Sequence, residues 1–139
     1  MVDAIISIKP RHVDNILSGR KTVELRLRSM NLPAGSRLWV YTTLPVGKIK
    51  ISTEIDFIEL LPPAKMWKKY GKNICISKRE FDTYTNARDL VVAIGLRNVK
   101  LLDKEICLKA LREYEENFQP PQFFSRLYPD RALYSIFYN

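Results

Sequence analysis

Residues 18–26 contain the side chains best suited to chemistry. The segment reads Ser-Gly-Arg-Lys-Thr-Val-Glu-Leu-Arg, and its charged members are Arg20, Lys21, Glu24 and Arg26. Lysine and arginine bind phosphate groups, and a glutamate can accept hydrogen bonds from a base or exchange a proton. The same pattern is also typical of an exposed strand face on which neighbouring charges form ion pairs. The spacing therefore indicates either an anion-binding site or a solvated strand face.

A helix is expected before this segment. Pro10 suits its first turn, where the missing N–H of proline would have no partner. Val13, Ile16 and Leu17 then fall on one helical face, at spacings of three and four residues. Gly19 ends the predicted helix, because glycine readily adopts the left-handed conformation of a helix cap. The charged segment thus begins at a sharp turn.

The segment is predicted to continue as a strand over residues 21–28, in which apolar and charged residues alternate. One face of this strand would meet the core, and the other would carry Glu24 and Arg26. Positions three apart on a strand point to opposite faces, so Lys21 and Glu24 meet only if Lys21 remains in the turn.

The rest of the chain alternates between short strands and short helices. Apolar and β-branched runs predict strands at residues 4–9, 37–43, 46–61, 89–99 and 132–138. Helices are predicted from Pro63 to Gly71 and over residues 76–86, where Ser77 and Glu80 form a capping box. A further helix is predicted over residues 107–117, and a single aromatic helical turn within residues 120–129.

This order predicts one α+β domain over residues 1–139, because neither a repeat nor a Gly/Ser linker interrupts it. Five or six strands with short helices suit a compact, partly open barrel with the helices packed outside. A doubly wound parallel sheet would need longer helices between all strands, and the Gly-rich phosphate loops of nucleotide-binding folds are missing.

Other polar and aromatic residues could join a cleft beside the charged turn. Lys9 leaves the first predicted strand. Tyr41, at the end of a neighbouring strand, could stack on a base, and the alternative role for it is packing in the core or at the barrel edge. The single histidine, His12, is expected on a helix surface, from where it could contact a ligand. The remaining candidates are Thr42 and Gln122.

The charge distribution favours an anionic partner. The net charge is +8, and residues 1–50 hold nine Lys and Arg against three Asp and Glu. Cys75 and Cys107 lie in apolar surroundings without a second ligand at metal-binding spacing, so we expect buried reduced thiols, no metal and no cofactor. With no apolar run long enough for a membrane helix and no signal peptide, the expected location is the cytoplasm.

The opening sequence ISIKPRHVDNILSGRKTVELR resembles the start of ASCH domains, members of the PUA-like superfamily. Their signature is a strand that ends in a Lys-Pro-like turn, a helix, and then Gly-x-Lys-x-x-Glu-x-Arg. In this chain the signature residues are Gly19, Lys21, Glu24 and Arg26. YTTLPVGKI is similar to the loop that faces the cleft in this family, and both residues 67–102 and the Pro-Pro-Gln-Phe element at 120–123 resemble a bacterial group.

The resemblance implies a PUA-like mixed β-barrel with peripheral helices, and a cleft between the signature turn and a facing loop. It also implies a role in binding RNA or another nucleic acid. Some small relatives are amidohydrolases that act on acylated cytidine nucleosides. This chain resembles them at Lys21, but it has Glu24 where they carry a threonine.

Three hypotheses about function follow. The first is a binding module for RNA, another nucleic acid or a nucleotide, which could act in regulation. Phosphate would be bound by Lys9, Arg20, Lys21 and Arg26, and a base by Glu24 and Tyr41. The second is a hydrolase of a modified nucleoside or a ribonuclease, in which Lys21 and Glu24 would form an acid/base pair. The third is a protein-interaction module, which exposed aromatic side chains would favour. The oligomeric state is left open.

Overall fold

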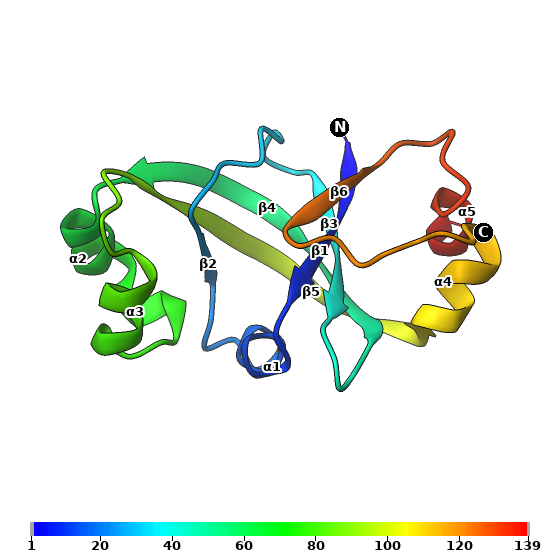
Figure 1. The fold of residues 1–139 in the computed structure, drawn as a ribbon, viewed down its shortest axis with the longest axis horizontal. Helices are drawn as coiled ribbons and strands as arrows, with labels where there is room; N and C mark the ends of the chain where they lie inside the picture. The colour runs from blue at the N-terminus through cyan, green and yellow to red at the C-terminus, as the bar shows by residue number, and fades with distance from the viewer. Residues whose placement is uncertain (1, 139) are drawn as a thin grey trace.

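A computed structural model describes residues 2–138, which form six strands and five short helices (Figure 1). The strands are β1 (Asp3–Ile8), β2 (Val23–Arg26), β3 (Arg37–Thr42), β4 (Lys48–Leu61), β5 (Val91–Cys107) and β6 (Phe124–Leu127). The helices are α1 (Pro10–Leu17), α2 (Pro63–Ile74), α3 (Lys78–Tyr84), α4 (Leu108–Tyr114) and α5 (Tyr134–Tyr138).

The six strands form one mixed sheet in the order β2-β5-β4-β3-β1-β6. Strands β1 and β3 are parallel, and the other neighbouring pairs are antiparallel. The sheet curls into a half-barrel whose two edge strands, β2 and β6, do not pair with each other. The predicted α+β class with five to six strands and peripheral helices is confirmed.

Helices cover both ends of the curled sheet. In Figure 1, α2 and α3 lie at one end, α4 and α5 lie at the other, and α1 lies beside the gap between β1 and β2. The central core combines α1 with the middle of the sheet, and two further apolar clusters fill the spaces under α2 and α3 and under α4 and α5. The half-barrel therefore does not close, and a gap remains between β2 and the end of β1, beyond the residues of β1 that pair with β6.

The structure corrects three predicted elements. Residues 124–127 form strand β6 rather than a helical turn, because they pair with the otherwise open edge of β1. Residues 134–138 form helix α5 rather than a strand, and the ring of Phe137 stacks on Trp39 at 4.5 Å. Strand β5 continues to Cys107 because it stays paired with β4 along nearly its whole length.

The structure also corrects the predicted end of helix α2 and the predicted burial of the two cysteines. Helix α2 does not stop at Gly71 but continues to Ile74 and is capped by Cys75, whose φ is +60°. A Cβ atom at Gly71 would lie 3.0 Å from the ring of Trp67, so this glycine makes room for the tryptophan rather than ending the helix. The expectation of two buried thiols is wrong for Cys107, which is exposed, whereas Cys75 is half-buried; both are free.

Candidate functional site

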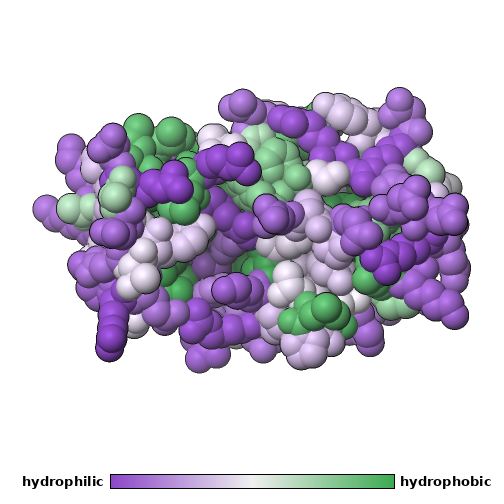
Figure 2. Space-filling model, viewed as in Figure 1, coloured by the Kyte–Doolittle hydropathy of each residue, from purple (hydrophilic) through white to green (hydrophobic). Residues whose placement is uncertain are grey.

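A cleft of about 1060 Å³ occupies the gap between β2 and β1. Figure 2 shows hydrophilic residues around a depression in the middle of this face of the molecule. The lining comes from the end of β1, α1, β2, the end of β3, α3, the start of α4 and residues 119–122. The opening of the half-barrel thus coincides with the charged turn predicted from the sequence, since Lys21, Glu24 and Arg26 line the cleft.

The turn between α1 and β2 places the first charged residue of the floor. Gly19 has a φ of +84°, as predicted for a helix cap. The backbone N–H of Lys21 donates to the carbonyl of Asn15 at 2.9 Å, and that of Thr22 donates to Asn73 at 3.0 Å. Lys21 therefore stays in the turn, before the strand begins at Val23.

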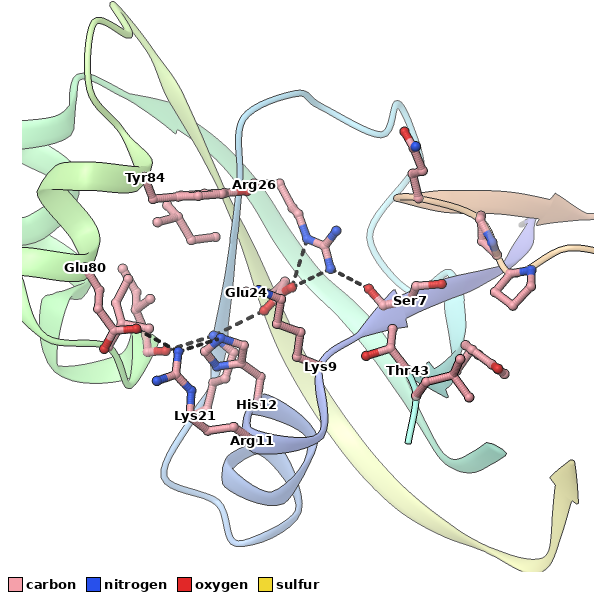
Figure 3. A pocket seen from close by; sticks show the side chains of 18 of the residues that line it. Ser7, Lys9, Arg11, His12, Lys21, Glu24, Arg26, Thr43, Glu80 and Tyr84 are labelled. Carbon is pink, nitrogen blue, oxygen red and sulfur yellow. Dashed lines mark hydrogen bonds and ion pairs between the residues drawn. The ribbon is translucent and has the colours of Figure 1, made fainter. Parts of the chain in front are cut away.

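Lys21 and Glu24 form a buried ion pair on the floor of the cleft (Figure 3). The Nζ of Lys21 lies 3.2 Å from Oε1 of Glu24 and donates to the carbonyl of Ile74 at 2.8 Å. Their side chains are 2% and 7% exposed, so the alternative of a solvated strand face is wrong here.

Arg26 connects this pair to the opposite wall. Its Nε donates to Oε2 of Glu24 at 2.8 Å, and its Nη2 donates to the backbone carbonyl of Ser7 at 2.7 Å. The guanidinium also lies 4.9 Å from the ring centre of Phe123. A side chain therefore bridges the gap that strand pairing leaves open between β2 and β1 (Figure 3).

The surroundings of Glu24 hold it in the ionised form. Burial by itself would raise the pKa of this carboxyl group, but the positive charges of Lys21 and Arg26 and their hydrogen bonds outweigh it, so the pKa lies below its usual value. Both carboxylate oxygens already have a cationic partner. At neutral pH Glu24 is thus a hydrogen-bond acceptor and a poor general acid.

His12 lies beside this cluster and is half-buried. Burial, followed by the charge of Lys21, lowers its pKa below the usual 6.5, so the imidazole is neutral at pH 7. Nη2 of Arg11 lies 3.5 Å from Nε2 of His12; because a guanidinium only donates, a hydrogen bond here requires the tautomer with the ring proton on Nδ1. Nδ1 is buried and has no hydrogen-bond partner among the described residues.

A second ion pair lies across one mouth of the cleft. Nη2 of Arg11 on α1 lies 2.8 Å from Oε2 of Glu80 on α3, and both side chains are largely exposed. Glu80 also belongs to the predicted capping box, which is present with Ser77. This contact ties α1 to α3 at the surface (Figure 3).

The other half of the cleft is lined by hydroxyl and aromatic groups. Ser7 and Tyr41 are register partners on the parallel strands β1 and β3, and Oγ of Ser7 is buried without a hydrogen-bond partner in residues 2–138. Burial raises the pKa of Tyr41, so its hydroxyl keeps its proton at neutral pH. Arg112 and Gln119 complete this side, joined by a hydrogen bond of 3.3 Å.

The cleft brings together six of the eight predicted site residues: Lys9, Lys21, Glu24, Arg26, Tyr41 and Gln122. Arg20 is exposed outside the lining, where its Nε donates to Oγ of Ser18 at 3.2 Å. Thr42 is buried and likewise not part of the lining, whereas the next residue, Thr43, is. Strand alternation explains this difference, since Thr42 points away from the face that carries Tyr41.

Sequence reasoning missed several lining residues. Arg79, Glu80, Thr83 and Tyr84 lie on one face of α3 at helical spacing, and Arg112 comes from α4. Their helical periodicity was readable, but only the tertiary structure shows which face meets the cleft. No group of three or more His, Cys, Asp and Glu residues that could hold a metal occurs within residues 2–138. No helix within the same residues is long and apolar enough to cross a membrane.

Comparison with known proteins identifies close relatives. The family model described as Domain of unknown function (DUF365) matches residues 2–123. An ASCH domain-containing ribonuclease of Zymomonas mobilis is 34% identical over 121 residues, which cover 86% of this chain and 80% of the relative. The crystal structure of ASCH from Zymomonas mobilis matches with a TM-score of 0.89 and 30% identity, over 96% of this chain and 94% of that one.

A more distant match shows the fold alone. Human THYN1 protein, crystallised in complex with 5-methylcytosine containing DNA, matches with a TM-score of 0.60 at 12% identity. The alignment covers 98% of this chain and 95% of that one. The curled half-barrel is thus shared well beyond the range of clear sequence similarity.

Proposed function

Since this chain belongs to the DUF365 family and is an ASCH domain protein, we propose that it is a ribonuclease that binds and cleaves RNA in the cleft between β2 and β1. The relative of 34% identity is named as a ribonuclease, which supports the activity. The observation that carries the proposal is the lining of the cleft, where cations surround one neutral imidazole.

The charges of the lining suit a polyanion. Six cationic side chains line the cleft against two carboxylates, Glu24 and Glu80. Both carboxylates are engaged by cations of the cleft itself. Lys9, Arg79 and Arg112 form no ion pair with a carboxylate of the described residues, so their charges are available to phosphate groups.

Cleavage follows from the same arrangement. The 2′-hydroxyl of a ribose replaces the 3.5 Å contact of Arg11 at Nε2, and the neutral His12 accepts its proton there while the 2′-oxygen forms a bond to the adjacent phosphorus. The bond from phosphorus to the 5′-oxygen breaks, and the leaving oxygen takes a proton from water. The cations of the cleft stabilise the extra negative charge on the phosphoryl oxygens. Glu24 does not transfer a proton in this scheme; it holds Lys21 and Arg26 in place.

The test compares RNA with DNA of the same sequence. We expect cleavage of RNA alone, with products that end in a 2′,3′-cyclic phosphate, because the 2′-hydroxyl is the nucleophile. His12→Ala should abolish cleavage while RNA binding persists. Cleavage of DNA at a similar rate, or full activity of His12→Ala, would contradict this chemistry; a wild type that neither binds nor cleaves RNA would refute the function as a whole.

A further inference from the structure

The strand at the edge of the cleft has a free backbone edge. β2 is an edge strand of the sheet, and within the part of the chain that the structure describes it pairs only with β5. Its other edge faces the gap toward β1, and Leu25 is one of the residues that line the cleft. A free strand edge presents unpaired N–H and C=O groups, which are strong hydrogen-bonding groups.

The register identifies which groups are free. In an antiparallel pair, residues that exchange hydrogen bonds alternate with residues whose N–H and C=O point away from the partner strand. The N–H of Leu96 donates to the carbonyl of Thr22 at 2.9 Å, so the bonded positions on β2 are the even-numbered ones. The N–H and C=O of Leu25 therefore both point away from β5, on the side of the cleft.

The surroundings of this edge suit a flat, polar ring. Tyr84, at the end of α3, lines the same part of the cleft and is 43% exposed. Figure 3 shows its side chain extending toward β2, near Arg26. An aromatic ring beside a donor and an acceptor is the arrangement with which proteins hold unpaired bases, by stacking and by hydrogen bonds to the Watson–Crick edge.

Addition of a peptide strand is disfavoured at this edge. β2 has only four residues, so it offers just two outward-facing positions, Val23 and Leu25. The guanidinium of Arg26 then crosses the gap to Ser7 and blocks continuation of a ladder. The cationic lining also favours a nucleic acid over a peptide.

We infer that the free edge of β2 at Leu25 recognises one unpaired base of the RNA, with its N–H and C=O bonded to the Watson–Crick edge of the base and Tyr84 against the base face. This inference rests on the proposed function and narrows its substrate class to single-stranded RNA. A base in a duplex uses the same edge for its partner, so a paired base cannot make these bonds.

Modified oligonucleotides test the hydrogen bonds from the ligand side. Hexamers of adenosine, cytidine or uridine are compared with neutral analogues whose Watson–Crick donor is methylated: N6,N6-dimethyladenosine, N4,N4-dimethylcytidine and N3-methyluridine. For the hexamer that binds best, we expect the analogue with the methylated Watson–Crick donor to bind at least tenfold more weakly than the unmodified hexamer. The control hexamer, made of 7-deazaadenosine or a 5-methylpyrimidine, should bind like the unmodified one. Equal affinity for the blocked analogue overturns the inference but leaves the proposed function standing. If none of the hexamers binds, both fail.

Amide exchange tests the same bonds from the protein side. In the free protein, the N–H of Leu25 should exchange much faster than those of Glu24 and Arg26, which are bonded to β5. The best-binding hexamer should slow exchange at Leu25 at least tenfold. If the hexamer leaves the exchange of the Leu25 N–H unchanged, the inference is contradicted. It is also contradicted if an extended Val-Thr peptide slows this exchange and RNA does not.

Substitution of the aromatic ring provides a further check. Tyr84→Ala should weaken binding of the hexamer about tenfold, the effect expected for loss of one stacked base. Tyr128→Ala is the matched control, because Tyr128 is 48% exposed and lies outside the lining. Equal effects of the two substitutions would overturn the role of Tyr84.

Discussion

Lys21 and Glu24 form a buried ion pair, although side chains three residues apart on a strand normally point to opposite faces of the sheet. The pair exists because Lys21 belongs to the turn after α1, so its side chain can reach over the start of β2 to Oε1 of Glu24 at 3.2 Å. Two charges taken out of water are costly, and their attraction offsets that cost only while both partners are present. The floor of the cleft is therefore a structural element as well as a source of charge.

Removal of one partner should strongly destabilise the protein. Lys21→Met leaves Glu24 buried with one cation fewer, and we expect a loss of roughly 3–5 kcal/mol in the free energy of unfolding, measured with urea. Lys78→Met is the matched control, because the pair of Lys78 with Asp82 is 56% exposed on both sides and should cost at most about 1 kcal/mol. Similar losses in the two variants would show that burial does not matter for the pair.

The turn before the pair depends on the backbone conformation of Gly19. A Cβ atom added there would meet no other atom within 4 Å, so any cost of substitution comes from the φ of +84° alone. We expect Gly19→Val to lose roughly 1–2 kcal/mol of stability. Gly19→Asn should lose less, because asparagine tolerates the left-handed region. Thermal unfolding of the wild type and the two variants measures their order of stability. A valine variant as stable as the wild type would contradict the expectation.

Elements with local signals could be predicted from the sequence. The helix from Pro10, the cap at Gly19 and the capping box of Ser77 with Glu80 each depend on residues a few positions apart. Residues 124–127 and 134–138 were assigned the wrong structure because both runs are short, apolar and aromatic. Only their distant partners, β1 for the first and Trp39 for the second, decide between strand and helix.

The site was predictable in the same limited sense. The charged turn and the end of β1 are local in sequence, and the structure brings Lys9, Lys21, Glu24 and Arg26 to one cleft. Tyr84 and the other residues of α3 reach the cleft from some 60 positions away. Their contribution depends on how α3 packs on the sheet, which short-range periodicity does not determine.

Binding of RNA should weaken steeply with salt, because each neutralised phosphate releases counterions. For a single strand the slope of log affinity against log salt is about −0.7 per phosphate contact. Lys9→Ala should make the slope shallower by about that amount. Arg20→Ala removes the same charge outside the lining and should leave it unchanged. A slope near zero for the wild type would refute an electrostatic interface.

Acylated cytidine should not be turned over. The carboxylate of Glu24 is held ionised by Lys21 and Arg26, and both of its oxygens are occupied. It therefore supplies neither a proton nor a free nucleophilic oxygen to an amide bond. Chromatography of N4-acetylcytidine incubated with the protein should show no cytidine above the uncatalysed background. Rapid turnover that is lost in Glu24→Gln, provided that this variant is folded, would replace the ribonuclease proposal with an amidohydrolase.

The rate of RNA cleavage should depend on the protonation state of His12. A general base acts in its neutral form, so the rate should rise with pH as the imidazole loses its proton and then reach a plateau. Because burial and the charge of Lys21 lower the pKa of His12, the midpoint of this rise should lie below pH 6.5. Single-turnover cleavage of a labelled RNA from pH 5 to pH 8 measures the profile. Arg11→Gln removes a cation that lies 3.5 Å from Nε2 and should move the midpoint upward, because Arg11 also lowers the pKa of His12. Arg20→Gln, outside the lining, should leave the midpoint unchanged. A rate that falls as pH rises from 5 to 7 would show that His12 is not the base. A midpoint that is the same in Arg11→Gln as in the wild type would show this too.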